Sequence, residues 1–179
     1  MPFYKKIIGD RLYLSPFDPG DAVAIKSWAE WMNDQVIADQ FGGHHQLISL
    51  SSATRAVSEL KGYRFAIVLL SDDTLLGHIS LHDIDLLNRN AFLGIVIGDT
   101  LQRNKGYGKE AIELVLEFGF FTLNLHSVML SVLANNPQAI ACYKKAGFRE
   151  AGIRREWAFR NGAYVDKVYM QVLCHEFAK

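Results

Sequence analysis

Several residue types that mark particular protein classes are scarce in this chain of 179 residues. Only two cysteines occur, Cys142 and Cys174, so no disulfide framework is expected and a reducing compartment is predicted. No apolar run approaches the roughly 20 residues that a membrane-spanning helix needs. The N-terminus, MPFYKKIIGD, lacks the apolar centre of a signal peptide. These absences predict a soluble, cytoplasmic protein with no membrane attachment.

An excess of positive charge is also missing, because 19 lysines and arginines balance 19 aspartates and glutamates. A neutral chain is not expected to capture the phosphate backbone of a nucleic acid, so direct nucleic-acid binding is not predicted. His78 and His82 are four residues apart in a predicted strand, about 13 Å, too far to share one metal ion. No metal site is therefore expected.

The chain is organised around a strand, a glycine-bearing turn and a helix near its middle. The apolar, β-branched run 92–97 predicts a buried strand, and residues 109–121 carry apolar side chains at helical spacing. A helix N-terminus offers unpaired N–H groups and positive potential, and glycine lets an anion approach the backbone closely. The turn, with Arg103, Lys105 and Lys109 around it, therefore predicts a site for a pyrophosphate-bearing cofactor.

Three phosphate-binding patterns compete for this turn. A Walker-type loop, G-x-x-x-x-G-K-[ST], occurs nowhere in the sequence. Gly106, Gly108 and Ala111 fit the alanine-ended dinucleotide fingerprint. That fingerprint calls for an acidic residue about 20 positions later, whereas residues 127–136 contain no Asp or Glu. The third pattern, R/Q-x-x-G-x-G/A, is met in full by residues 103–108, which read RNKGYG.

A second block, NPQAIACYKKAGF at residues 136–148, follows an apolar strand predicted at 128–133. Together the two blocks resemble the GNAT family of N-acetyltransferases, in which N-x-x-A-x-x-x-Y-x-x-x-G-F follows the phosphate-binding turn. The resemblance extends over most of the chain, apart from residues 31–60. It departs at Asn104, where many relatives have glycine. Asparagine tolerates positive φ better than most residues, so we expect the turn to survive.

The resemblance implies acetyl-coenzyme A (acetyl-CoA) as the cofactor and a primary amine as the acceptor. Family members bind the pyrophosphate on the turn, and the pantetheine arm enters a gap between two splayed strands. The implied cofactor-binding residues are Ile95, Val96, Ile97, Arg103, Asn104, Lys105, Gly106, Tyr107, Gly108, Lys109, Asn136 and Tyr143. The alternative is a module that senses coenzyme A (CoA) without turnover, because a glutamate frequent among relatives is Phe92 here.

Tyr143 is the candidate catalytic acid. Free tyrosine has a pKa of ~10, against ~8.5 for a thiol, so Tyr143 would remain protonated until the thiolate leaves. Asn136 lies seven residues earlier on the same helical face and is expected to cap the helix, contact the cofactor, or both.

The sequence does not identify a general base, because Phe92 cannot accept a proton. The candidates are His78, His82, Asp83, Asp85, His44 and His45. Water is the remaining route.

The C-terminal pattern at residues 161–169 resembles a branch that holds ribosomal-protein alanine acetyltransferases and spermidine acetyltransferases. A peptide or protein N-terminus is predicted slightly ahead of a polyamine, an amino acid or an amino-sugar. Asp83, Asp85 and Asp166 are candidates for attracting a cationic acceptor.

The predicted fold class is α/β, a single GNAT-like domain over residues 1–179 with a central, splayed mixed sheet and helices on both faces. The expected order is β-α-α-β-β-β-α-β-α-β-β. The remaining predicted elements are a strand at 11–14, helices at 18–33 (capped by Asp18), 51–61 and 136–146, a hairpin of 64–70 with 75–86, and a closing hairpin of 148–160 with 163–173. Asn161-Gly162 is a strong two-residue turn signal between the last two strands. Exposed strands there permit a homodimer without requiring one.

Overall fold

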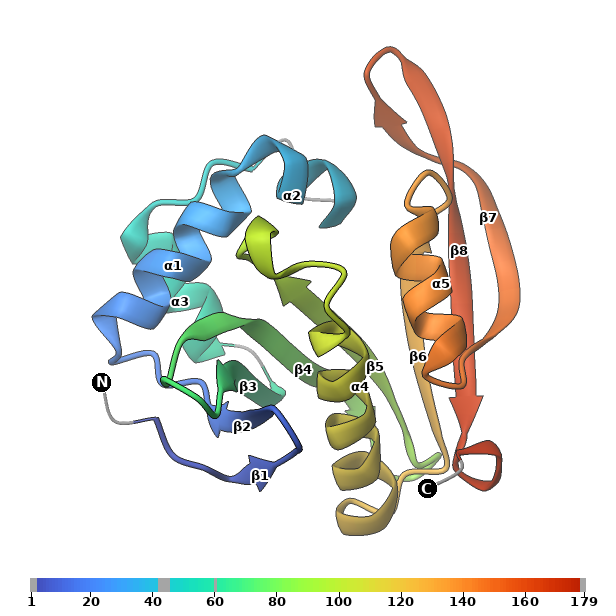
Figure 1. The fold of residues 1–179 in the computed structure, drawn as a ribbon. Coiled ribbons are helices and arrows are strands. Elements are labelled where there is room, and N and C mark those ends of the chain that lie inside the picture. Colours follow the sequence, from blue (N-terminus) through green and yellow to red (C-terminus); the bar gives the residue numbers. More distant parts are fainter. Residues whose placement is uncertain (1–2, 42–45, 60, 178–179) are drawn as a thin grey trace.

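The computed structural model describes residues 3–41, 46–59 and 61–177. Within these residues the centre of the molecule is one sheet of eight strands in the order β1-β2-β3-β4-β5-β6-β8-β7 (Figure 1). The pair β5 and β6 is parallel, whereas the other neighbouring pairs are antiparallel. The strands are β1 Ile7–Ile8, β2 Leu12–Pro16, β3 Gly62–Leu69, β4 Leu75–Asp85, β5 Asn90–Ile97, β6 Ser127–Leu133, β7 Arg149–Arg160 and β8 Ala163–Leu173.

The helices agree with the predicted pattern except at two points, the cap of α1 and the additional helix α2. They are α1 Ala22–Asn33, α2 Gln35–Phe41, α3 Leu50–Glu59, α4 Tyr107–Glu117 and α5 Pro137–Lys145, with short turns of 3-10 or π type at Thr100–Gln102, Phe118–Thr122 and Cys174–Glu176. The predicted cap of α1 is wrong, because Asp21 accepts the N–H groups of Val23 and Ala24 at 3.0 and 3.1 Å. Asp18 accepts from Gly20 in the preceding turn instead.

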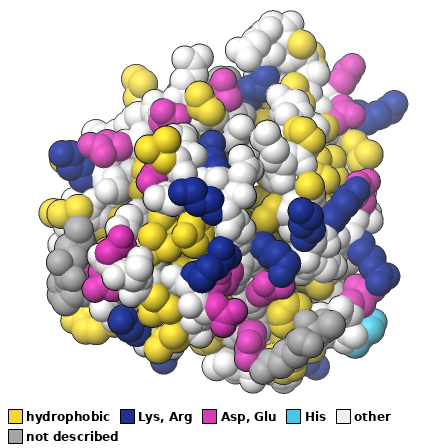
Figure 2. Space-filling model, viewed as in Figure 1, with side chains coloured by type: hydrophobic (Ala, Val, Ile, Leu, Met, Phe, Trp, Pro, Cys, Tyr) yellow, Lys and Arg dark blue, Asp and Glu magenta, His cyan; other side chains and the backbone are white. Residues whose placement is uncertain are grey.

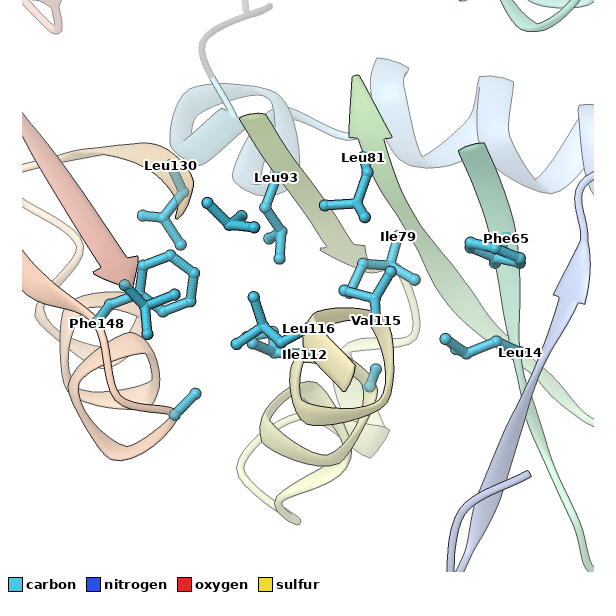
Figure 3. Packing of buried hydrophobic residues seen from close by; sticks show 14 of the residues in the cluster. Leu14, Phe65, Ile79, Leu81, Leu93, Ile112, Val115, Leu116, Leu130 and Phe148 are labelled. Atoms are coloured by element: carbon cyan, nitrogen blue, oxygen red, sulfur yellow. The ribbon is translucent and has the colours of Figure 1, made fainter. Parts of the chain in front are cut away.

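Helices cover both faces of the sheet, as predicted. Along β3, Phe65 and Ile67 belong to the core shared with α4 and α5, whereas Ala66 and Val68 belong to the core shared with α1, α2 and α3. This alternation follows from the period of two in a strand. Figure 3 shows Ile112 and its α4 neighbours reaching up to the strands of the first core. The sheet thus separates two differently lined sides of the molecule.

The parallel strands β5 and β6 separate after a short pairing. Their register joins Asn90–Phe92 to Ser127–Met129 and ends there. Both strands continue beyond this point, so the remaining residues, 93–97 of β5 and 130–133 of β6, border a gap. The predicted splay of the sheet is confirmed, and it opens toward the C-terminal ends of both strands.

The closing hairpin is also as predicted. Asn161 and Gly162 both have positive φ, 48° and 84°, as a type I′ turn requires. The hairpin extends past the end of α5 (Figure 1). Arg160 donates from Nε to the carbonyl of Asp39 in α2 at 3.3 Å. The hairpin and α2 therefore meet at the open end of the gap.

Candidate functional site

The gap between β5 and β6 opens into a cleft of about 1060 Å³. Its walls come from β5, the turn before α4, the facing sides of α4 and α5, the end of β6, the β7–β8 hairpin and α2. Pockets for a single small ligand usually span about 300–1000 Å³. This cleft therefore has the size to hold a large ligand and part of a second one.

Eleven of the twelve residues predicted to bind the cofactor line this cleft. The exception is Lys105, whose ammonium donates to Gln102 Oε1 at 2.9 Å. The carbonyl of Lys105 accepts from Arg11 Nη1 at 2.8 Å. Lys105 thus contributes to the shape of the turn through these two contacts.

The turn before α4 has the backbone that a close anion contact needs. Asn104 and Gly106 have positive φ values of 61° and 86°, so the asparagine adopts the conformation expected of it. Gly106 is the N-cap of α4 and offers no capping side chain. The first N–H groups of α4, including those of Tyr107 and Gly108, have no acceptor within the helix and remain available to a ligand.

Arg11 holds this turn from outside the cleft. Its Nε donates to Glu110 at 2.8 Å, its Nη1 donates to the Lys105 carbonyl, and its guanidinium lies 4.8 Å from the centre of the Tyr107 ring. Arg11 was not among the predicted site residues, because Arg11 and Glu110 are 99 positions apart. No local motif signals a contact of that range.

Arg103 acts as a clamp on the end of β5. Its Nε and Nη2 both donate to the carbonyl of Ile97, each at 3.1 Å. Lys109 pairs with Glu113 one turn further along α4. The side chains around the turn therefore fix its conformation, and the unpaired donors at its centre belong to the backbone.

The free edge of β5 presents peptide groups to the gap. The N–H of Gly98 donates to Leu76 in β4 at 2.9 Å. Peptide groups alternate in direction along an antiparallel pair, so those of Val96 also face β4. Those of Leu93 and Ile95 then face the gap, where β6 no longer pairs with them. Of the three residues predicted to bond the pantetheine arm, Ile95 and Ile97 face the gap, and the carbonyl of Ile97 already accepts from Arg103.

Tyr143 lies on α5 and lines the cleft. Its ring packs edge-on against Phe148, with 6.2 Å between ring centres. Burial raises the pKa of its phenol above the usual value, and the neighbouring Cys142 adds to the effect. The hydroxyl therefore stays protonated at any physiological pH. Asn136 caps α5 by accepting the Ala139 N–H at 3.1 Å and also lines the cleft, so both of its expected roles are compatible.

The structure separates the candidate bases. His78 is buried beneath α1, 6.1 and 6.3 Å from the ring centres of Phe17 and Trp28, and is not part of the cleft. Burial, followed by the nearby Arg64 charge, lowers its pKa to about 3. The imidazole of His78 therefore stays uncharged near neutrality.

His82, by contrast, lines the cleft beside the gap. It stacks on Phe92, directly opposite in the β4–β5 register, with 6.2 Å between ring centres. Its Nδ1 lies 3.1 Å from Asp83 Oδ2. A Cβ on Gly94 would come 3.6 Å from its Nε2, so Nε2 lies over the face of β5 at Gly94, which also lines the cleft. His44 and His45 lie outside the described residues.

The three carboxylates predicted to attract a cationic acceptor lie outside the cleft lining. Asp85 accepts the N–H groups of Leu87 and Asn88 at 2.9 Å each and forms a turn. Asp166 accepts the Glu156 N–H at 2.8 Å. The side chain of Asp83 is exposed. None of them is placed to bind an acceptor inside the cleft.

Neither a metal cluster nor a membrane-spanning helix occurs in the described part of the chain. No three His, Cys, Asp or Glu side chains there come together in a way that could hold a metal ion. The helices of the same residues are all too short or too polar to cross a membrane.

The split sheet and the turn before α4 are features that the resemblance to GNAT N-acetyltransferases implied. Residues 11–149 match the model of the acetyltransferase (GNAT) domain. The chain therefore belongs to the GNAT acetyltransferase family, and the resemblance seen in its sequence is confirmed.

The names of individual relatives refer to different acceptors. Spermidine N(1)-acetyltransferase of Vibrio cholerae is 36% identical over 99 residues, 55% of this chain and 57% of that protein. Putative ribosomal N-acetyltransferase YdaF of Bacillus subtilis is 33% identical over 109 residues, 61% of this chain and 59% of that protein. The chain thus spans less than two thirds of the length of these relatives. The crystal structure of spermidine N-acetyltransferase from Vibrio cholerae in complex with CoA and spermine superimposes with a TM-score of 0.82 at 26% identity, covering 92% of this chain and 96% of that one.

Proposed function

We propose that the protein is an acetyl-CoA-dependent N-acetyltransferase that acts on a primary amine. In this reaction the amine nitrogen bonds to the thioester carbonyl carbon, the carbon–sulfur bond breaks, the nitrogen loses one proton and the thiolate gains one. One observation carries the proposal: a single cleft joins the glycine-bearing turn at α4, through the gap in the sheet, to the space bordered by α2 and the closing hairpin.

The backbone would hold the cofactor. The N–H groups that open α4 suit a diphosphate, and the peptide groups of Leu93 and Ile95 suit the amides of a pantetheine arm. Acetyl-CoA would supply the activated acyl group. A β5 N–H facing the thioester oxygen would stabilise negative charge there, an arrangement whose loss costs about 3–4 kcal/mol of barrier in other acyl-transfer sites. The CoA in the similar spermidine N-acetyltransferase structure supports this assignment.

Two side chains would move the protons. His82 would accept the amine proton, since it lines the cleft with its Nε2 over Gly94 of β5, and Asp83 lies against its Nδ1. Tyr143 would donate a proton to the leaving thiolate, because it lines the cleft and keeps its proton. The glutamate frequent among relatives is replaced by Phe92, and the ring of Phe92 supports His82 instead.

For the acceptor, a peptide or protein N-terminus remains our prediction ahead of a polyamine, an amino acid or an amino-sugar. An α-amine has a pKa of ~7.7–8.0, against ~10.4 for a lysine-type amine, so it is neutral more readily near pH 7. The homodimer and the cytoplasmic location also stay predictions. The exposed side chains along β7 leave room for self-association.

The test is to incubate the protein with acetyl-CoA and a panel of primary amines while following thiol release, with CoA affinity measured in parallel by calorimetry. We expect thiol release that depends on an amine and an acetylated product in the mass spectrum. Tight CoA binding with no release for any amine would refute the enzymatic proposal and support the CoA sensor. Absence of CoA binding would refute both.

A further inference from the structure

The charge of the cleft differs from that of the whole protein. The chain is neutral, yet the described cleft lining contains five Lys or Arg side chains and no Asp or Glu. These cations are Arg103, Lys109, Lys145, Arg160 and Lys167. Figure 2 shows Lys and Arg side chains gathered over α4 and α5 on one face of the molecule. The phosphates of CoA account for three of these cations, Arg103, Lys109 and Lys145, at the α4 and α5 end of the cleft.

The other two cations, Arg160 and Lys167, lie on the opposite side of the sheet from α4 and α5. Along β8, Val168 and Met170 pack into the core shared with α4 and α5, so Lys167 faces the side of α1 and α2. Arg160 donates to the Asp39 carbonyl of α2, a helix whose Ile37 packs into the core on that same side. The two groups are therefore separated from the α4 N-terminus by the sheet and border the acceptor end of the cleft.

Arg160 is held in place without a negatively charged partner. It is only 8% exposed. Its Nε donates to Asp39 O, and its Nη1 donates to Phe159 O at 2.8 Å. Among the described residues neither Arg160 nor Lys167 forms an ion pair. A buried charge without a counter-ion is costly, and a guanidinium whose position is fixed in advance is well suited to bind a carboxylate.

Apolar groups form the rest of this end. Phe92, Phe159 and Trp157 line the cleft together with Ile37. Lys167 lies 5.6 Å from the ring centre of Trp157. A ligand that fits here has an apolar body and one anionic group.

We propose that the acceptor is a primary amine that also carries a carboxylate, an amino acid or short peptide with an apolar side chain, and that Arg160 and Lys167 bind this carboxylate. The inference rests on the proposed acetyltransferase function and narrows its substrate class. A polyamine is disfavoured, because its several ammonium groups would meet two cations and no described carboxylate in the lining.

The experiment compares acceptors that differ in one group. Thiol release from acetyl-CoA is measured with phenylalanine, phenylalaninamide, phenethylamine, the dipeptide Phe-Phe and spermidine. A hydrogen bond to a charged group contributes about 1.5–3 kcal/mol, so we expect kcat/KM for phenylalanine or Phe-Phe to exceed that for phenethylamine by roughly 10- to 100-fold. The relative rates of phenylalanine and Phe-Phe distinguish an amino acid from a peptide.

Variants of the two cations test the assignment. Arg160→Gln should bring the ratio of kcat/KM for phenylalanine and phenethylamine close to one. Lys167→Gln should lower the same ratio and serves if Arg160→Gln does not fold, as judged by thermal melting and CoA calorimetry. The matched control is Arg155→Gln, exposed on the same hairpin and outside the cleft lining, which should leave the ratio unchanged.

Two results have different meanings. Equal or better use of spermidine or phenethylamine would overturn the carboxylate assignment while leaving the acetyltransferase proposal intact. Failure of every amine despite CoA binding would overturn the proposed function itself, and this inference with it.

Discussion

Replacing Gly108 by alanine should separate folding from cofactor binding. Gly108 lies in the first turn of α4, where its φ is not positive. A Cβ there would meet Cys142 Sγ and Ile97 Cγ1, both at 3.8 Å, which is ordinary van der Waals contact. Alanine is better than glycine within a helix by about 0.5–1 kcal/mol. The variant should therefore be at least as stable as the wild type, with a melting temperature up to about 4 °C higher.

The same methyl group would enter the cleft at the N-terminus of α4. Its two nearest side-chain neighbours, Ile97 and Cys142, are themselves cleft residues. A phosphate that contacts the backbone here would be displaced, and we expect the Kd for CoA to rise at least tenfold, which corresponds to about 1.4 kcal/mol.

Calorimetric titration with CoA, alongside thermal unfolding, measures both effects of Gly108→Ala. Gly152→Ala is the matched control, since its added Cβ would lie within 4 Å of nothing and Gly152 is not part of the cleft lining. It should bind CoA like the wild type. Unchanged affinity in Gly108→Ala would refute the placement of the phosphates at this turn.

The other predictions concern single side chains. Tyr143→Phe should lower kcat about 100-fold or more while leaving the Kd for CoA nearly intact; lost affinity at unchanged kcat would contradict its role as the acid. His82→Gln should lower kcat/KM by a similar factor, whereas a wild-type kcat/KM would exclude His82 as the base. His78 is neutral when folded, with its pKa lowered to about 3, but takes up a proton in the unfolded chain below pH 6.5. Stability should therefore fall with pH between about 6 and 3, by up to about 1.4 kcal/mol per pH unit from this group. Denaturant titrations at several pH values give the free energy of unfolding as a function of pH. This free energy should change less steeply with pH in His78→Gln than in the wild type, and equal steepness would refute the burial argument.

Local patterns predicted most of the elements that build the cleft, with the exception of α2. The β-branched run of β5, the helical spacing of α4 and the Asn161-Gly162 turn each depend on neighbours in sequence. The exact cap of α1 was not predictable in the same way, because Asp18 and Asp21 are both suitable residues three positions apart. The helix α2 was missed because it is seven residues long and follows α1 after Asp34 alone.

Other parts of the site depend on contacts that no sequence pattern reports. His78 and His82 share one face of β4, and only the cover of α1 over His78 distinguishes a buried histidine from one at the cleft. Likewise Arg160 comes to the acceptor end through α2, 121 positions away. The sequence therefore predicted residues of β5, α4 and α5 that line the cleft, but not the residues of α2 and the closing hairpin that border its other end.

The early end of β5–β6 pairing gives the protein a strand edge in its interior. Exposed edges of this kind on a protein surface recruit strands from other chains and promote aggregation. Here the peptide groups of Leu93 and Ile95 are enclosed between two halves of the same sheet. An extended ligand with amide groups would pair with these peptide groups as an additional strand. The fold thus places an unpaired strand edge at a ligand cleft inside the molecule, and not at the outer edge of the sheet.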